Sequence, residues 1–516
     1  MRKIVEIKVL PKDVENQAII EQKVLKKSRI DPKDVSHMVV VKRSIDARGR
    51  QPMYFLRVEV YIHENLDPEE DYLSKLKDVA KANEVVIIGA GPAGYFAALE
   101  LIELGMKPII FERGKDVQSR RKDLRAIQQF GIVDEDSNYC FGEGGAGTYS
   151  DGKLYTRSHK RGNIYKILKL LVEHGAKKSI MIDAHPHIGS NKLPLIIENI
   201  RNTILKHGGE VHFESKVTDI LVENNSVKGI VINHSDEFLT RHIILATGHS
   251  ARDIYYMYQK KGWKIESKPF ALGIRLEHPQ PIIDKIQYHQ AKREESLPAA
   301  SYKLVCQVEG RGVFSFCMCP GGLVVPAATA PGEIVVNGMS LSRRDSPFAN
   351  SGIVVAVEES DLLDFKEQGV FAGLAFQQSI EQAMFNAGDG SQKAPAQRMT
   401  DFVKGKKSKT LPKSSYIPGL NNTRLDMLLP LDISNRLKKG LIQFGKKMKG
   451  YYTDEAVAIG VESRTSSPLK IPRDKQSLMS EIEGLYPCGE GAGYAGGILS
   501  AAMDGQNVAR RVFSFN

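Results

Sequence analysis

Residues 84–115 constrain the fold of this chain most strongly, because they place a glycine-rich turn between a strand and a helix. The segment opens with Glu-Val-Val-Ile-Ile-Gly-Ala-Gly-Pro-Ala-Gly-Tyr from residue 84. Its apolar run, residues 85–88, is typical of a parallel strand buried on both faces. A helical stretch follows and leads to a second apolar run, residues 108–111. The order predicts the first strand, turn, helix and second strand of a dinucleotide fold.

Each glycine of this turn has a different physical reason. Gly89 permits the tight bend, Gly91 lets the backbone approach a pyrophosphate, and Gly94 lets the helix pack closely on the strand. Glu112 follows the second strand about 20 residues after the turn, where a carboxylate binds ribose hydroxyls. A glycine-rich turn with a purely structural role and no ligand is the alternative.

Length and composition describe an ordinary globular protein. The chain has 516 residues, 42% of them hydrophobic and 26% charged, which is enough for about three domains. It has no run of 18 apolar residues, and its first residues lack the pattern of a signal peptide. Five cysteines form an odd and sparse set, which suits a reducing compartment. We therefore expect a cytoplasmic protein without a membrane span.

Positive charge is concentrated in two runs. Residues 1–50 hold 13 Lys or Arg against 7 Asp or Glu, and residues 401–450 hold 12 against 3. Such runs could bind RNA or anionic substrates, but they are more often solvated faces. Near the first run, the aromatic residues suited to base stacking are Tyr54 and Phe55. We expect a small-molecule substrate as partner, and nucleic acid stays open as an alternative.

The pattern of elements predicts an α/β protein with a Rossmann-like domain, an inserted α+β substrate domain and a small N-terminal β-α-β-β module. Within residues 1–75 we expect strands at 3–9, 36–44 and 53–62 and a helix at 15–27. An acidic connector of helical character covers residues 64–83. The first part of the nucleotide-binding domain is 84–250, the inserted domain 251–450 and the C-terminal part 451–516.

Glycine-rich stretches recur at three further places. Residues 138–154 contain five glycines with Phe141, Tyr149 and Leu154 between them, which favours a packed loop against a flat or phosphorylated ligand over a mobile loop. Ala246-Thr-Gly follows a short apolar strand. The third stretch, from residue 484, contains Glu490 and precedes a C-terminal apolar helix. All three are expected to face a cofactor.

Two pairs of residues invite a more specific interpretation. His185 and His187 could hold a metal, but a third ligand is lacking nearby, and we predict no metal site. Cys317 and Cys319 lie in a run that reads as a strand, where residues i and i+2 share a face with Cβ atoms about 6–7 Å apart. A disulfide requires about 3.5–4.5 Å. We therefore predict that they are not a redox-active dithiol, although Pro320-Gly-Gly could break the strand.

The longer motifs resemble those of a known family. They are Gly-Glu-Gly-Gly-Ala-Gly-Thr at 142–148, Ala-Thr-Gly-His-Ser-Ala-Arg at 246–252, Ser-Phe-Cys-Met-Cys-Pro-Gly-Gly at 315–322, Glu-Ser-Arg-Thr-Ser-Ser-Pro at 462–468 and Gly-Glu-Gly-Ala-Gly-Tyr-Ala-Gly-Gly-Ile at 489–498. The chain resembles, over nearly its whole length, the poorly characterised FAD-dependent dehydrogenases. These are NAD(P)/FAD-dependent oxidoreductases of the glutathione-reductase structural class. Glu490 stands where many flavoproteins have aspartate, but it matches this family.

The resemblance implies FAD as cofactor, with hydride transfer through the flavin and NAD(P)H at most as a transient reductant, since the chain has one dinucleotide turn. A helix that begins near Gly496 would stabilise the reduced flavin with its partial positive charge. The residues predicted to bind the cofactor are Gly89, Gly91, Pro92, Ala93, Gly94, Glu112, Arg113, Gly144, Gly145, Gly147, Thr148, Val217, Ala246, Thr247, Gly248, Gly489, Glu490, Gly491, Ala492, Gly496, Gly497 and Ile498.

The residues that act on a substrate are less constrained. Arginine can grip a carboxylate or phosphate and histidine can exchange a proton near neutral pH, so the candidates are His249, Arg252, Arg275, His278 and Arg464. A structural role is the alternative for each. The sequence therefore predicts an FAD-dependent oxidoreductase of unknown substrate. An RNA-associated flavoprotein and a flavin redox sensor without turnover are the two other hypotheses.

Overall fold

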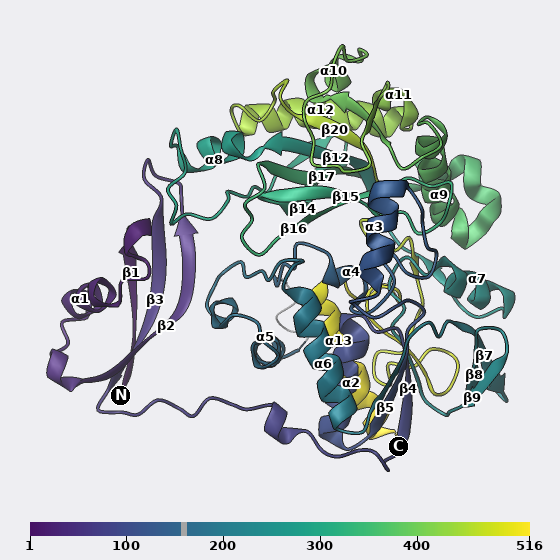
Figure 1. The fold of residues 1–516 in the computed structure, drawn as a ribbon, viewed down its shortest axis with the longest axis horizontal. Coiled ribbons are helices and arrows are strands. Elements are labelled where there is room, and N and C mark those ends of the chain that lie inside the picture. Colours follow the sequence, from purple (N-terminus) through teal and green to yellow (C-terminus); the bar gives the residue numbers. More distant parts are fainter. Residues whose placement is uncertain (156–161, 516) are drawn as a thin grey trace.

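A five-stranded parallel sheet forms the lower right part of the molecule in Figure 1. The computed structural model describes residues 1–155 and 162–515. The strands, in spatial order, are β22 (Leu485–Pro487), β10 (Ile243–Leu245), β4 (Glu84–Ile88), β5 (Lys107–Phe111) and β6 (Glu210–His212). The strands predicted at 85–88 and 108–111 are thus confirmed as β4 and β5, neighbours in this sheet.

Both faces of this sheet are covered, which explains the unbroken apolar run of β4. Val85 and Ile87 belong to one buried cluster with the surrounding helices, whereas Val86 and Ile88 belong to another, with the β7–β9 sheet. The helices are α2 (Pro92–Leu104), α5 (Ile164–Glu173), α6 (Leu193–Lys206) and α13 (Ile498–Ser514). The antiparallel strands are β7 (Val217–Glu223), β8 (Ser226–Ile232) and β9 (Asp236–Leu239).

A second, seven-stranded sheet lies above the first in Figure 1. Its order is β13 (Val305–Val308), β14 (Arg311–Cys319), β17 (Phe348–Ala356), β12 (Ala271–Pro279), β20 (Val457–Glu462), β18 (Ala394–Arg398) and β19 (Leu420–Asn422). Its pairs are antiparallel except β18 with β19. Because β20 pairs with β12 and β18, this sheet extends past the boundary expected at residue 450.

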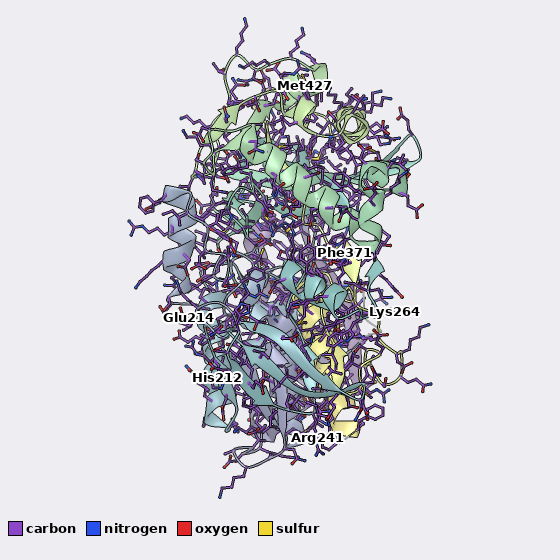
Figure 2. All side chains as sticks on the ribbon, turned by 90° about the vertical axis from the view of Figure 1, so that its right-hand side faces the viewer. His212, Glu214, Arg241, Lys264, Phe371 and Met427 are labelled. Atoms are coloured by element: carbon purple, nitrogen blue, oxygen red, sulfur yellow. The ribbon has the colours of Figure 1, made fainter. Side chains whose placement is uncertain are left out.

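Helices and a hairpin complete this upper part. The helices are α8 (Gln280–Tyr288), α9 (Ala372–Asn386), α10 (Met399–Lys404), α11 (Leu425–Leu428) and α12 (Leu431–Lys447). The hairpin is β15 (Gly322–Pro326) with β16 (Val336–Ser340). The helix α7 (Arg252–Lys260) instead packs with the cluster of β7–β9. Figure 2 shows Phe371 midway between Met427 at one end of the molecule and Arg241 at the other.

The N-terminal residues form β1 (Arg2–Val9), α1 (Gln17–Ser28), β2 (Val35–Asp46) and β3 (Met53–Ile62), in an antiparallel sheet of order β1-β3-β2. Contacts with the rest of the chain include backbone hydrogen bonds of Arg43 with Ile182 and Ala184, and buried residues of this sheet belong to one hydrophobic cluster with those of the seven-stranded sheet. Two side-chain contacts add to these. Arg43 forms an ion pair with Asp183 at 2.6 Å, and the Tyr54 hydroxyl donates to the Ser296 carbonyl at 3.1 Å.

We expected the connector, residues 64–83, to be helical, and this expectation is wrong. In this fully described stretch, the one helical element is a short 3-10 turn, Leu73–Lys75. Its acidic side chains are used in ion pairs with separate partners, such as Glu69 with Lys169 at 2.5 Å. Tyr72 is buried among the helices of the parallel sheet. Among the described residues, no helix has the length and apolar character to cross a membrane.

Candidate functional site

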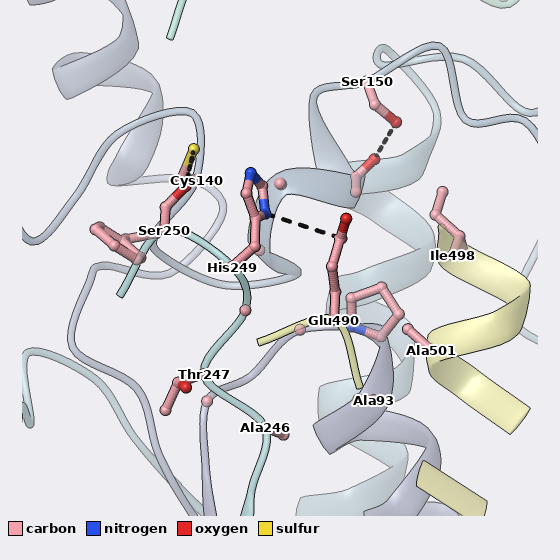
Figure 3. Close-up of a pocket in the computed structure, with 18 of the residues that line it drawn as sticks. Ala93, Cys140, Ser150, Ala246, Thr247, His249, Ser250, Glu490, Ile498 and Ala501 are labelled. Atoms are coloured by element: carbon pink, nitrogen blue, oxygen red, sulfur yellow. Dashed lines mark hydrogen bonds and ion pairs between the residues drawn. The ribbon is translucent and has the colours of Figure 1, made fainter. Parts of the chain in front are cut away.

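A single long cavity of about 530 Å³ runs from the carboxyl ends of β4 and β5 to the N-terminus of α13 and the end of β14. This is the edge of a parallel sheet where ligands bind in α/β proteins. Its wall contains segments far apart in the chain: the turn after β4, the 138–154 loop, the turn after β10 and residues 490–501. Figure 3 shows Ala93, Thr247, Glu490 and Ile498 around it.

The glycines of the turn after β4 have two different roles, close backbone packing and access to the cavity. A Cβ at Gly89, where φ is +104°, would lie 2.5 Å from the Ala246 carbonyl oxygen, and one at Gly94 would collide with the Gly89 carbonyl. These two glycines therefore serve the fold. A Cβ at Gly91 would meet no atom within 4 Å, because it would point into the open cavity. Gly91 is the N-cap of α2 without a side-chain cap, so the first amides of the helix are left to bind an anion.

Glu112 lines the cavity but is already held by the backbone. Its carboxylate accepts N–H groups of Ala90 at 2.8 Å, Gly114 at 3.0 Å and Gly142 at 2.9 Å. A carboxylate has about four acceptor positions, so about one is left for a ribose hydroxyl. The side chain therefore ties the phosphate turn to the glycine loop as well as facing the cavity.

Arg113 and Phe141 form a flat wall at the same end. The Arg113 guanidinium lies 4.5 Å from the Phe141 ring centroid and is fixed by Asp253 at 2.8 Å. Both residues line the cavity, as does Val217 from β7. A guanidinium stacked on an aromatic ring offers a planar surface to an aromatic base.

The 138–154 loop is packed around Arg120, as its interleaved aromatic residues predict. Arg120 is fully buried and donates to the carbonyls of Asn138 at 2.8 Å, Glu143 at 2.8 Å and Gly145 at 3.0 Å. The Glu143 carboxylate in turn accepts from the Tyr95 hydroxyl at 2.7 Å and from Arg201 at 2.9 Å. These bonds hold Gly145 and Gly147 against the cavity.

The opposite end of the cavity is polar. Gly496, Gly497 and Ile498, at the start of α13, line it together with His249 and Glu490. His249 Nδ1 lies 3.9 Å from Glu490 Oε2, the contact dashed in Figure 3. Burial lowers the pKa of His249 to about 4 and raises the pKa of Glu490 to about 7. His249 is therefore neutral at pH 7, so the contact is not an ion pair, whereas Glu490 can gain or lose a proton there.

Arg252 and Arg464 belong to a buried, charge-balanced cluster beside this end. Glu381 pairs with Arg252 at 2.7 Å and Arg464 at 2.9 Å, and Glu333 pairs with the same arginines at 2.9 and 3.0 Å. Although burial opposes it, the two guanidinium groups hold the pKa of Glu381 well below its usual range. Both arginines are thus saturated. Arg464 also lines, with His249 and Cys140, a cavity of about 30 Å³.

Arg275 and His278, both on β12, are fully buried. Arg275 donates to Glu462 at 2.7 Å, Asn350 at 2.9 Å and the Cys317 carbonyl at 2.7 Å. His278 Nε2 lies 2.8 Å from the Tyr451 carbonyl. Neither side chain lines the long cavity, and these contacts support their structural alternative.

Most of the predicted cofactor residues line the long cavity: Gly89, Gly91, Pro92, Ala93, Glu112, Arg113, Gly145, Gly147, Val217, Ala246, Thr247, Gly248, Glu490, Gly496, Gly497 and Ile498. Gly94, Gly144, Thr148, Gly489, Gly491 and Ala492 do not line it. Several of these six pack behind the wall: a Cβ at Gly491 would collide with the Gly248 backbone.

The cavity wall also contains residues that were not named as cofactor ligands, including Lys153, Ser215, Phe316 and Cys317. Two signals pointed toward part of them: the glycine-rich stretch 138–154, which contains Lys153, and the Cys-Met-Cys motif. Among the described residues, no cluster of three or more His, Cys, Asp or Glu could hold a metal ion.

The parallel sheet, the open Gly91 turn and the N-termini of α2 and α13, which both meet the cavity, define a dinucleotide-cofactor protein. The family model "FAD-dependent protein, C-terminal domain-like" matches residues 269–465, and a domain family of unknown function matches residues 1–61. An uncharacterised protein of Clostridium beijerinckii is 39% identical over 513 residues, covering 96% of this chain and 95% of its own.

The chain belongs to the same family as the C. beijerinckii protein, a family of FAD-dependent proteins, and its cofactor is FAD. Shorter likeness is found to the thiamine thiazole synthase of Aeropyrum pernix, 27% identical over 197 residues, which are 35% of this chain and 60% of that protein. The structure of CtdE in complex with FAD is 11% identical and covers 83% of this chain and 84% of its own, with a TM-score of 0.34.

Proposed function

We propose that this flavoprotein is an oxidoreductase that moves a hydride between FAD and a small molecule. The observation that carries the proposal is the polar end of the cofactor cavity. There His249, Glu490 and Lys153 meet residues of β14 from the second sheet. A cavity that serves the cofactor alone has no need of titratable groups at one end, whereas a reaction that transfers protons with electrons does.

In this proposal the adenosine part of FAD lies against Arg113, Phe141 and Val217, with Glu112 at the ribose. Its pyrophosphate lies over Gly91, at the N-terminus of α2. The isoalloxazine ring then lies between the N-terminus of α13 and β14, where it would accept or donate the hydride. The residues present fit this arrangement, because the amides of α2 and α13 at the cavity lack side-chain caps and no Cβ projects from Gly91, Gly496 or Gly497.

The protein's own groups would handle the proton. Glu490, with its pKa raised to about 7 by burial, can hold a proton at Oε2 or release it near neutral pH. His249 stays neutral and can accept from Glu490 or orient a substrate group by hydrogen bonding. Arg252 and Arg464, saturated by Glu333 and Glu381, position the 246–252 turn rather than grip a substrate.

We also propose the division into domains expected from the sequence, with one change. Residues 84–250 and the C-terminal segment form the FAD domain, and the inserted substrate domain runs to about residue 465, because β20 pairs inside its sheet. With one dinucleotide turn in the chain, NAD(P)H would reach the flavin from solvent as a transient reductant.

The basic run supports the RNA-associated alternative only in part. Lys404, Lys406, Lys407 and Lys409 line one open surface cavity with Arg398, and Tyr452 is the aromatic residue there. Retention on immobilised RNA that falls steeply with salt would support this role.

Anaerobic mixing tests the proposed activity. The dithionite-reduced holoprotein should regain its flavin absorbance within seconds when a quinone, oxygen or another small acceptor is added, and Glu490→Gln should slow this step. Because Glu103 is part-buried and outside the cavity, Glu103→Gln serves as the matched control. If no small acceptor reoxidises the reduced flavin, the proposed oxidoreductase activity is wrong. The flavin redox sensor without turnover is then the hypothesis that remains.

A further inference from the structure

Strand β14 is interrupted at its last residues by a bulge. Phe316 pairs with Gly352 and Cys319 with Asn350 on β17, so residues 317 and 318 stand opposite one residue, Ser351. Cys317 has φ of +44°, in the left-handed region that non-glycine residues rarely adopt. The regular strand expected from the sequence is therefore wrong here. The expected separation of about 6–7 Å between the Cβ atoms of Cys317 and Cys319 applies to a regular strand and not to this bulge.

Two cations hold the bulge. Arg275 donates to the Cys317 carbonyl at 2.7 Å and approaches the Cys319 sulfur at 3.6 Å. Lys153 donates to the Met318 carbonyl from the cavity side. The strained residue is thus fixed by groups whose positive charge stabilises a thiolate. Arg275, considered above for substrate binding, acts here as a positioning residue.

The two cysteines face different surroundings. Cys317 lines the FAD cavity, whereas Cys319 is fully buried behind it and its thiol also lies 3.3 Å from the Cys317 carbonyl. A hydrogen bond from Cys319, together with Lys153 and Arg275, lowers the pKa of Cys317. The same bond and burial raise the pKa of Cys319. An accessible thiolate beside a buried thiol is the arrangement of an attacking and a resolving cysteine.

We propose that Cys317 and Cys319 form a redox-active dithiol that exchanges an electron pair with the flavin, which makes disulfides or dithiols the substrate class of this site. The inference rests on the proposed function, because the flavin is the electron partner. Among the described residues, no group of three or more His, Cys, Asp or Glu that could hold a metal ion includes these thiols, so no metal site competes with the dithiol role.

The step balances in either direction. When the Cys317 thiolate and the Cys319 thiol are oxidised, Cys319 loses its proton and one S–S bond forms between the two sulfurs. The two electrons and that proton would pass to FAD, which would supply the two-electron acceptor. In the reverse direction the reduced flavin would return both electrons and the proton, and the disulfide would become the thiolate and the thiol again. The Cys317 thiolate then attacks an external disulfide and releases one thiol, and Cys319 displaces the second as the intramolecular disulfide re-forms.

Reductive titration of the holoprotein tests this. After oxidation with diamide and desalting, anaerobic titration with dithionite should take four electrons per FAD in the parent. It should take two in Cys317→Ser and in Cys319→Ser. Cys306→Ser is the control, because Cys306 is buried on neighbouring β13 and outside the cavity, and it should still take four.

A peptide measurement gives a second readout that does not need the flavin. Trypsin should release residues 312–343, which contain Cys317 and Cys319 and no other cysteine. After diamide this peptide should resist alkylation and be lighter by two hydrogens, and after dithiothreitol it should carry two adducts. Two electrons per FAD in the parent, or two adducts after diamide, would overturn the dithiol while leaving the proposed function intact. A purified protein without FAD would instead overturn the proposed function and, with it, this inference.

Discussion

Replacing Gly91 by valine should remove FAD and leave the folded chain in place. The backbone at Gly91 has φ of −79° and ψ of −175°, which valine adopts without strain. A Cβ there meets no atom within 4 Å in the protein. The added methyl groups instead enter the cavity in front of the α2 amides, where the proposed pyrophosphate lies.

The two effects differ in size. Without a clash, the loss of glycine at the N-cap should cost the apoprotein less than about 1 kcal/mol, a change in melting temperature below about 3 °C. For FAD, a displaced pyrophosphate loses its contact with the helix N-terminus, and we expect at least about a 100-fold loss of affinity, about 2.7 kcal/mol. Gly94→Ala should behave differently, because its Cβ collides with the Gly89 carbonyl and damages the fold itself.

The assay is the ratio of flavin to protein absorbance after purification, followed by FAD titration of the apoprotein and a thermal melt. Gly312→Ala is the matched control, since its Cβ also has no atom within 3.8 Å and it lies outside the cavity. Gly91→Val protein that purifies with stoichiometric FAD would refute the placement of the pyrophosphate.

Three further outcomes are expected. Calorimetric titration should show weak binding of NADH and NADPH, because one dinucleotide turn is present, and submicromolar affinity for either would contradict this. A chain beginning at Pro68 should keep its FAD, because it retains Tyr72 in the core of the FAD domain. A chain beginning at Ser74 would lack that side chain. If the chain that begins at Pro68 is folded but colourless, FAD binding depends on residues 1–67 and the prediction is wrong. Finally, Glu490 has its pKa raised from 4.5 to about 7 by burial, so the folded apoprotein holds a proton that the unfolded chain has released and loses stability as the pH rises from about 4.5 to 7. Glu490→Gln should remove this loss of stability. The loss is at most about 3 kcal/mol and smaller in practice, because the side chain is 25% exposed. If the melting temperatures of parent and variant change with pH in the same way, the prediction is wrong.

The parallel sheet of the FAD domain could be predicted from the sequence, because its strands and turns are determined by residues that are neighbours in the chain. The apolar run before Gly89 and the helix after it are set by neighbouring residues, and the structure places β4, α2 and β5 close to the predicted bounds. The seven-stranded sheet could not be predicted in the same way, because β12 pairs with β20 across nearly 200 positions of the chain. No periodicity carries that information.

The roles of the catalytic candidates also depend on contacts with residues far away in the chain, which the sequence does not reveal. Arg252, Arg275 and Arg464 were suggested by residue type, and the carboxylates that saturate them come from distant elements, α9 and β20 among them. The bulge at Cys317 likewise depends on Arg275 and Lys153. Alternation along β14 predicts a regular strand, and only the contacts from outside the strand show why it breaks.

A crystal structure of the holoprotein would test the central claim most directly. We expect electron density for FAD along the long cavity, with the pyrophosphate over Gly91 and the isoalloxazine ring between the N-terminus of α13 and the Cys317 sulfur. Density that places the ring beside Val217 and the adenine beside Cys317, or a flavin outside this cavity, would contradict the account.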